Sequence, residues 1–75
     1  MKVTILNPKH VLFDGDAKSV FLPGDLAEFE IMDYHAPIVS LLVRGDIVID
    51  WETRIPIRQG MIKFDNNECT ILVEE

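Results

Sequence analysis

The sequence predicts one all-β domain, a small flattened sandwich or barrel of about eight to ten short strands. Hydrophobic residues recur at a spacing of two along most of the chain, and residues that favour turns interrupt them every five to ten positions. A chain of 75 residues is also too short to divide into two hydrophobic cores. We therefore treat residues 1–75 as a single domain.

Three strands are expected in the first third of the chain, each ended by residues that favour turns. The Asp14-Gly15 pair is a hairpin-turn signal. The Pro23-Gly24 pair suits the centre of a type II turn, which needs glycine at its third position. We expect these strands at residues 3–6, 11–13 and 18–22.

Residues 25–31 fit either a short helix or a strand. Asp25 to Glu28 resembles a helix capping box, but Pro37 leaves little more than two turns of room, and such short helices are marginal in water. A strand would place Phe29 and Ile31 on one face and glutamates on the other. We favour the strand, because every neighbouring element is one.

A continuous hydrophobic run predicts a strand over residues 38–43, and a hairpin follows it. In that hairpin Trp51 has the parity of Ile47 and Ile49, which places it in the core or an interface, with residues 52–53 as the turn. Pro56 has no N–H for a ladder, so its strand is expected at an edge or a bulge.

The last predicted hairpin pairs residues 61–64 with residues 69–73 around a turn at 65–68. Cys69 has the parity of Ile71 and Val73 and is expected to be a small buried residue. A reactive thiol would need an electropositive setting, whereas Glu68 is adjacent. One cysteine forms no internal disulfide, and it suggests a reducing, cytoplasmic setting.

The charge of the chain argues against several classes of partner. The net charge of −6 disfavours nucleic acid and anionic lipid. The longest hydrophobic run, residues 36–43, is far below the roughly 18 residues that span a bilayer, and no secretory signal is recognisable. Residues 14–33 hold six carboxylates and one lysine, so most of the excess negative charge lies in this segment.

Catalysis has little support in the sequence. His35 lies near Asp33, Glu28 and Glu30, so an acid–base pair or a metal site is conceivable, but no nucleophile, oxyanion loop or ligand doublet accompanies it. The four glycines are isolated and form no phosphate-binding loop. We therefore expect no catalytic residue, no cofactor and no metal, and we favour a protein-binding role for the acidic segment.

A series of short motifs resembles one known family. The segments Leu22-Pro23-Gly24, Glu28-Phe29 and His35-Ala36-Pro37 are similar, in order, to the L-P-G-x-x-G-E-F-G-V-L-P-G-H-A-P signature of the epsilon subunit of F-type ATP synthases. The opening strand, the residues before the signature and the closing Thr70-Ile71-Leu72-Val73 segment also agree. The similarity spans essentially the whole chain.

Four departures from the family pattern are visible. Ala27 and Glu30 replace glycines around the Glu-Phe pair. Asp33-Tyr34 replaces the usual Pro-Gly before His35, so this loop is expected to follow a different backbone path. Arg58-Gln59-Gly60 stands where S-G-G is usual. The chain ends at Glu75, where the family continues into a two-helix hairpin that carries ATP sensing and autoinhibition, so we expect neither function here.

The resemblance implies a non-catalytic rotor subunit that joins the gamma subunit to the ring of c subunits. It implies a peripheral location on the cytoplasmic face of the inner membrane, with membrane contact only through the c ring. The partner-binding residues that it implies are Glu28, Glu30, Asp33, Tyr34 and His35. A free-standing acidic β-sandwich adaptor for another basic protein remains the alternative.

Overall fold

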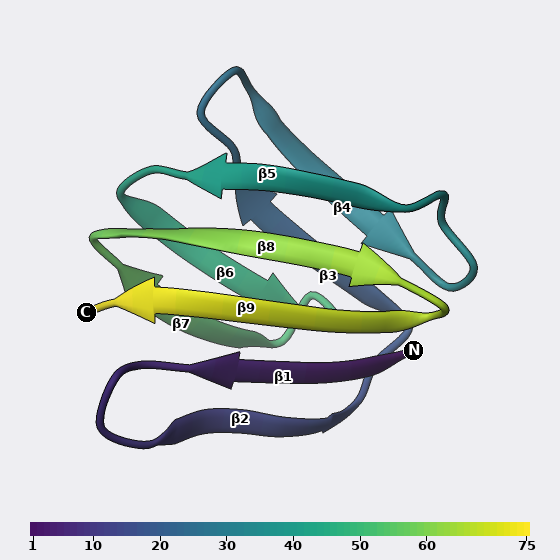
Figure 1. Cartoon of the computed structure of the whole chain (residues 1–75), viewed down its shortest axis with the longest axis horizontal. Coiled ribbons are helices and arrows are strands. Elements are labelled where there is room, and N and C mark those ends of the chain that lie inside the picture. The colour runs from purple at the N-terminus through teal and green to yellow at the C-terminus, as the bar shows by residue number, and fades with distance from the viewer.

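The computed structural model describes residues 1–75 as two sheets of strands packed face to face (Figure 1), which confirms the predicted all-β sandwich. The chain contains no helix that could span a bilayer. The strands, in chain order, are β1 (Lys2–Leu6), β2 (Val11–Asp16), β3 (Ser19–Pro23), β4 (Glu28–Met32), β5 (Ile38–Leu42), β6 (Gly45–Ile49), β7 (Thr53–Ile57), β8 (Gln59–Asp65) and β9 (Glu68–Glu74).

The five-stranded sheet combines strands from both ends of the chain, whereas the four-stranded sheet uses strands from its middle. The five-stranded sheet has the order β2-β1-β9-β8-β5, and the four-stranded sheet has the order β4-β3-β6-β7. All neighbouring strands are antiparallel except β1 and β9, which pair in parallel with Val3 opposite Cys69 and Leu6 opposite Leu72. The first and last strands therefore lie side by side (Figure 1).

The core lies between the sheets and is formed by alternate residues of nearly every strand. In β9, for example, Cys69, Ile71 and Val73 point inward and their neighbours outward. Sixteen buried hydrophobic residues form one cluster, and burial of such side chains from water is the main force holding the sheets together. The largest of its fully buried members are Phe64, Ile5, Leu22, Ile31, Ile47, Ile62 and Ile71.

The ambiguous segment is the strand β4, as we favoured. Ile31 is fully buried and Phe29 packs against the core, while Glu28 and Glu30 alternate with them on the outer side. β4 pairs only with β3, so it forms one edge of the four-stranded sheet. The period of two, rather than local helix propensity, decides the conformation, because only a strand buries both hydrophobic residues.

Of the two positions expected for Trp51, core or interface, the core is wrong, and so is the turn expected at residues 52–53. The strand β6 ends at Ile49, and Asp50 and Trp51 form the turn with φ values of 51° and 59°. The Asp50 carboxylate accepts hydrogen bonds from the backbone N–H groups of Lys18 (2.7 Å) and Ser19 (3.0 Å), which ends the strand two residues early. Trp51 is consequently 70% exposed, and its ring lies against that of Phe21 with a centroid distance of 5.9 Å.

The prediction for Pro56 is confirmed, since β7 is an edge strand. Two expected glycine turns are wrong. Gly15 lies within β2 opposite Val3, and Gly24 has no positive φ but forms a bridge with Leu42. The last hairpin turns within the expected residues 65–68, at Asn66 and Asn67.

Position 60 requires a glycine because the backbone of β9 lies very close to it. Replacing Gly60 therefore tests the packing of β8 on β9. A Cβ atom at Gly60 would lie 2.5 Å from the Leu72 carbonyl oxygen, whereas one at Gly15 would meet nothing nearer than 3.6 Å. We expect Gly60→Ala to lower the free energy of unfolding by about 1–3 kcal/mol, because backbone must shift. Gly15→Ala, the matched control within a strand, should change it by less than about 1 kcal/mol. Urea denaturation measures both, and equal effects would contradict the packing argument.

The Cys69 thiol gives a second prediction. Burial raises its pKa from the ordinary 9.0 to about 12. Between pH 9 and 12 the unfolded thiol ionises while the folded one stays protonated, so the contribution of Cys69 to the free energy of unfolding falls as pH rises through this range. At pH 8 we expect alkylation of the native protein to be roughly a thousandfold slower than that of the unfolded chain. Denaturation curves of Cys69→Ala provide the control. If the free energy of unfolding of that variant fell equally between pH 9 and 12, the decline could not be assigned to the Cys69 thiol.

Candidate functional site

The predicted partner-binding residues follow one edge of the sandwich. Glu28 and Glu30 lie on the outer side of β4, and Asp33, Tyr34 and His35 lie in the loop that joins β4 to β5. Glu28 begins the strand, so about 13 Å of strand, at a rise of ~3.3 Å per residue, separates it from the end of β4. We call residues 25–35 the acidic edge. It is an extended strip rather than a single pocket.

The carboxylates of the acidic edge are not equally free to bind a partner. Residues 25–35 hold four carboxylates and no lysine or arginine. The Asp33 carboxylate accepts a hydrogen bond from the α-ammonium of Met1, and that of Glu30 accepts one from the Ser19 hydroxyl at 2.5 Å. Asp25 and Glu28 are exposed with no side-chain partner. These two therefore carry most of the charge that a partner could reach.

Exposed hydrophobic side chains lie between these charges. Leu26 is 96% exposed, Tyr34 is 83% exposed and Met32 is 58% exposed. Side chains of this kind add contact area to an electrostatic interface, whose charges mainly set orientation and association rate. The acidic edge thus combines negative charge with uncovered apolar surface.

His35 lies on the surface and not in a closed pocket, which overturns the acid–base hypothesis. It is exposed, its ring meets Phe64 edge-on at a centroid distance of 6.1 Å, and its Nδ1 lies 2.7 Å from the Ala36 carbonyl oxygen. Glu28 lies at the other end of β4, out of reach of the imidazole. No three His, Cys, Asp or Glu side chains come together in an arrangement that could hold a metal ion.

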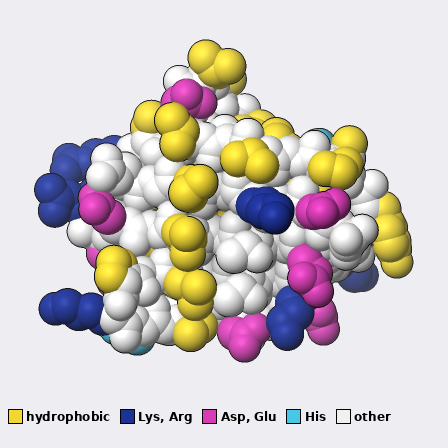
Figure 2. Space-filling model, in the orientation of Figure 1, with side chains coloured by type: hydrophobic (Ala, Val, Ile, Leu, Met, Phe, Trp, Pro, Cys, Tyr) yellow, Lys and Arg dark blue, Asp and Glu magenta, His cyan; other side chains and the backbone are white.

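A second surface was not predicted from the sequence. On the outer face of the five-stranded sheet, the strand registers place one hydrophobic residue from each strand in a single row. We call this row the apolar stripe. It runs across the strands and is visible as a column of hydrophobic side chains in Figure 2. Its members, from β2 to β5, are Val11, Leu6, Leu72, Met61 and Leu41.

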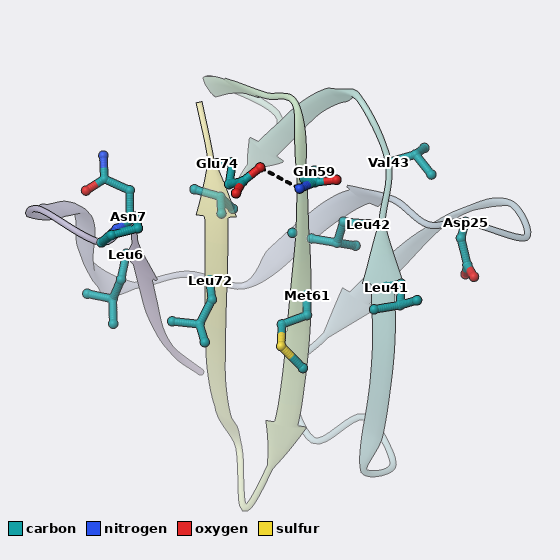
Figure 3. Close-up of a pocket in the computed structure, with 13 residues that line it drawn as sticks. Leu6, Asn7, Asp25, Leu41, Leu42, Val43, Gln59, Met61, Leu72 and Glu74 are labelled. Carbon is teal, nitrogen blue, oxygen red and sulfur yellow. Dashed lines mark hydrogen bonds between the residues drawn. The ribbon is translucent and has the colours of Figure 1, made fainter.

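The middle of the apolar stripe forms the floor of an open groove of about 720 Å³. Figure 3 shows Leu6, Leu72 and Met61 side by side along it, with Leu41 beyond. A hydrogen bond of 2.5 Å between Gln59 and Glu74 lies beside this row. The groove is hydrophobic with polar residues at its border, as expected of a surface that a protein partner covers.

The two surfaces meet at one corner of the molecule. Asp25 belongs to the acidic edge and also lines the groove, and its backbone N–H donates to the Leu41 carbonyl oxygen at 3.1 Å. The sequence holds one signal for the stripe: Leu41, Met61 and Leu72 have the parity opposite to the core residues of their strands. Parity alone could not show that they form one row, because the row depends on register.

A known family matches the whole chain. Residues 1–75 match the model for the β-sandwich domain of the ATP synthase delta/epsilon chain. The ATP synthase epsilon chain of a Sulfurovum species is 41% identical over 99% of this chain and 61% of its own length. That of a Nitratiruptor species is 37% identical over 99% of this chain and 60% of its own length. The chain thus spans about three fifths of the length of these relatives.

Solved structures show the same fold. A chain in the cryo-EM structure of the central stalk and c ring of the Tetrahymena thermophila mitochondrial ATP synthase matches with a TM-score of 0.80 at 19% identity. The match covers 99% of this chain and 63% of that one. A chain in the Euglena gracilis mitochondrial ATP synthase matches with a TM-score of 0.83 at 14% identity, covering 97% of this chain and 49% of that one.

Proposed function

The chain belongs to the family of β-sandwich domains of ATP synthase delta/epsilon chains, and from this premise we propose that it is a non-catalytic part of the rotor that attaches the gamma subunit to the c ring. A part that joins two partners needs two binding surfaces, and the chain has two of different chemistry. The observation that carries the proposal is this pair of surfaces, the acidic edge and the apolar stripe, on one rigid sandwich.

We assign the acidic edge to the polar loops of the c ring. In the family, the loop that contains His35 faces these loops, which usually carry a basic residue. Asp25 and Glu28 supply unpaired negative charge at one end of the edge, and Tyr34 and His35 supply exposed contact surface at the other. Charge complementarity of this kind favours the correct register of two rotating parts more than it adds affinity.

We assign the apolar stripe to the gamma subunit. Five strands at a spacing of ~4.8 Å make the stripe about 19 Å long, enough for one partner element to lie across the sheet. Burying its exposed side chains releases water from hydrophobic surface, which suits a permanent attachment better than a transient one. This assignment names the face toward gamma, which the sequence left open.

The mechanism that we propose requires stiffness and adhesion, with no bond made or broken by this chain. Torque passes between partners only if the part between them does not deform. A core of sixteen buried residues and a sheet that joins both ends of the chain provide that resistance. A free-standing adaptor would use the same two surfaces, but the family membership favours the rotor.

Charge reversal at Glu28 tests the assignment of the acidic edge. We expect Glu28→Lys to weaken binding to isolated c ring by roughly three- to tenfold at low salt, and less at high salt because the interaction is screened. Glu52→Lys is the matched control, since Glu52 is an exposed carboxylate at the tip of the β6–β7 hairpin, whose strands do not pair with β4. Asp33 is a poorer choice, because Met1 already holds its carboxylate. Equal effects of the two reversals would reject the assigned edge.

Truncation within the apolar stripe tests the other assignment. We expect Leu72→Ala to weaken binding to the gamma subunit by about tenfold, because it removes the central side chain of the stripe. Thr70→Ala, on the same outer face of β9 but outside the stripe, should change binding less than about twofold. Isothermal titration against purified gamma measures both. Unchanged binding by Leu72→Ala would exclude this face, and no binding by the unmodified chain would favour the adaptor.

A further inference from the structure

The loop of the acidic edge contains one backbone conformation that its sequence does not favour. His35 N–H donates to the Met32 carbonyl oxygen at 3.1 Å and closes a four-residue turn. Tyr34, the third residue of this turn, has a φ of 63°. Side chains other than glycine, asparagine and aspartate rarely adopt this left-handed region, at a cost on the order of 1 kcal/mol. Some contact outside the turn must therefore hold Tyr34.

The residue types that the resemblance implies for this loop bear on Tyr34. Asp33-Tyr34 stands where a Pro-Gly pair is usual, and glycine takes a positive φ without strain. Tyr34 takes the positive φ that a glycine there would tolerate. A tyrosine with this positive φ is strained where a glycine would not be, which makes the turn dependent on a support.

The side chain of Asn67 provides that support. Its Oδ1 accepts a hydrogen bond from the Tyr34 backbone N–H at 2.8 Å, across 33 positions of the chain. Asn67 is itself held by its backbone, because its carbonyl oxygen accepts the Lys2 N–H at 3.1 Å. With φ values of 50° and 58°, Asn66 and Asn67 form the two-residue turn between β8 and β9, a turn for which asparagine is well suited.

We propose that Asn67 is a positioning residue of the acidic edge, whose hydrogen bond to the Tyr34 backbone presents the Tyr34 and His35 side chains to the partner surface. The inference rests on the proposed function, in which this loop meets the polar loops of the c ring. The contact between Met1 and Asp33 holds the start of the loop, while Asn67 holds its apex. Without Asn67 the strained turn can relax, and the partner must then reorder the loop on binding.

Glycine at each asparagine of the turn gives a matched pair of variants. Asn67→Gly removes the acceptor for the Tyr34 N–H, whereas Asn66→Gly removes a side chain for which no hydrogen bond is found. Glycine tolerates the positive φ at both positions, so both variants should fold. Asn67→Asp keeps an oxygen acceptor and should behave as the unmodified protein.

Two readouts separate the inference from the function on which it rests. By NMR hydrogen exchange, we expect the Tyr34 amide to exchange about tenfold faster in Asn67→Gly than in Asn66→Gly. Binding to isolated c ring should weaken about three- to tenfold in Asn67→Gly alone. Tyr34→Ala, which removes the presented side chain, should weaken binding at least as much.

Equal exchange of the Tyr34 amide in the two glycine variants would overturn the inference. The inference would also be overturned if Tyr34→Ala weakened binding to the c ring and Asn67→Gly did not. This second result would leave the proposed function intact. If none of the variants, Glu28→Lys included, changed c-ring binding, the assignment of the acidic edge itself would fall.

Discussion

The parallel pairing of β1 with β9 is the interaction on which the rest of this molecule depends. It joins the two ends of the chain in the middle of the five-stranded sheet, where both strands contribute fully buried residues such as Ile5 and Ile71. The contact spans more than 60 positions, so its entropic cost is met only when the whole core forms. We therefore expect the sandwich to unfold as one cooperative unit.

The same pairing builds both candidate binding surfaces. It sets Leu6 beside Leu72, which makes the apolar stripe continuous across the sheet. It also brings Met1 to the acidic edge and fixes Asn67 beside β1, so that the loop after β4 is held from two sides. The proposed function requires two surfaces that keep their relative positions under load, and one pair of strands sets the position of both.

Several features of the structure were predicted correctly from the sequence, because each depends on a single physical rule. The period of two identified β4 as a strand, since only that conformation buries Phe29 and Ile31 together. The missing N–H of Pro56 placed β7 at an edge. The burial of Cys69 followed from its parity in β9. The same parity rule placed Trp51 in the core or an interface, and the core position is wrong. The Asp50 carboxylate bonds to backbone groups of a distant segment, and the chain turns before Trp51.

The sequence by itself determined the fold class, the strand pattern, the family and the position of the excess negative charge, because alternation, turn residues and motifs are local properties of the chain. Only the tertiary structure decided which carboxylates stay free, that four hydrophobic side chains near the chain ends and middle join Met61 in one row, and that Asn67 supports Tyr34. These depend on register and on contacts between residues dozens of positions apart. No local pattern encodes the row, because a shift of one residue in strand register would move its side chains to the other face. No local pattern encodes the contact of Asn67 with Tyr34 either, because it joins two turns that are 33 positions apart.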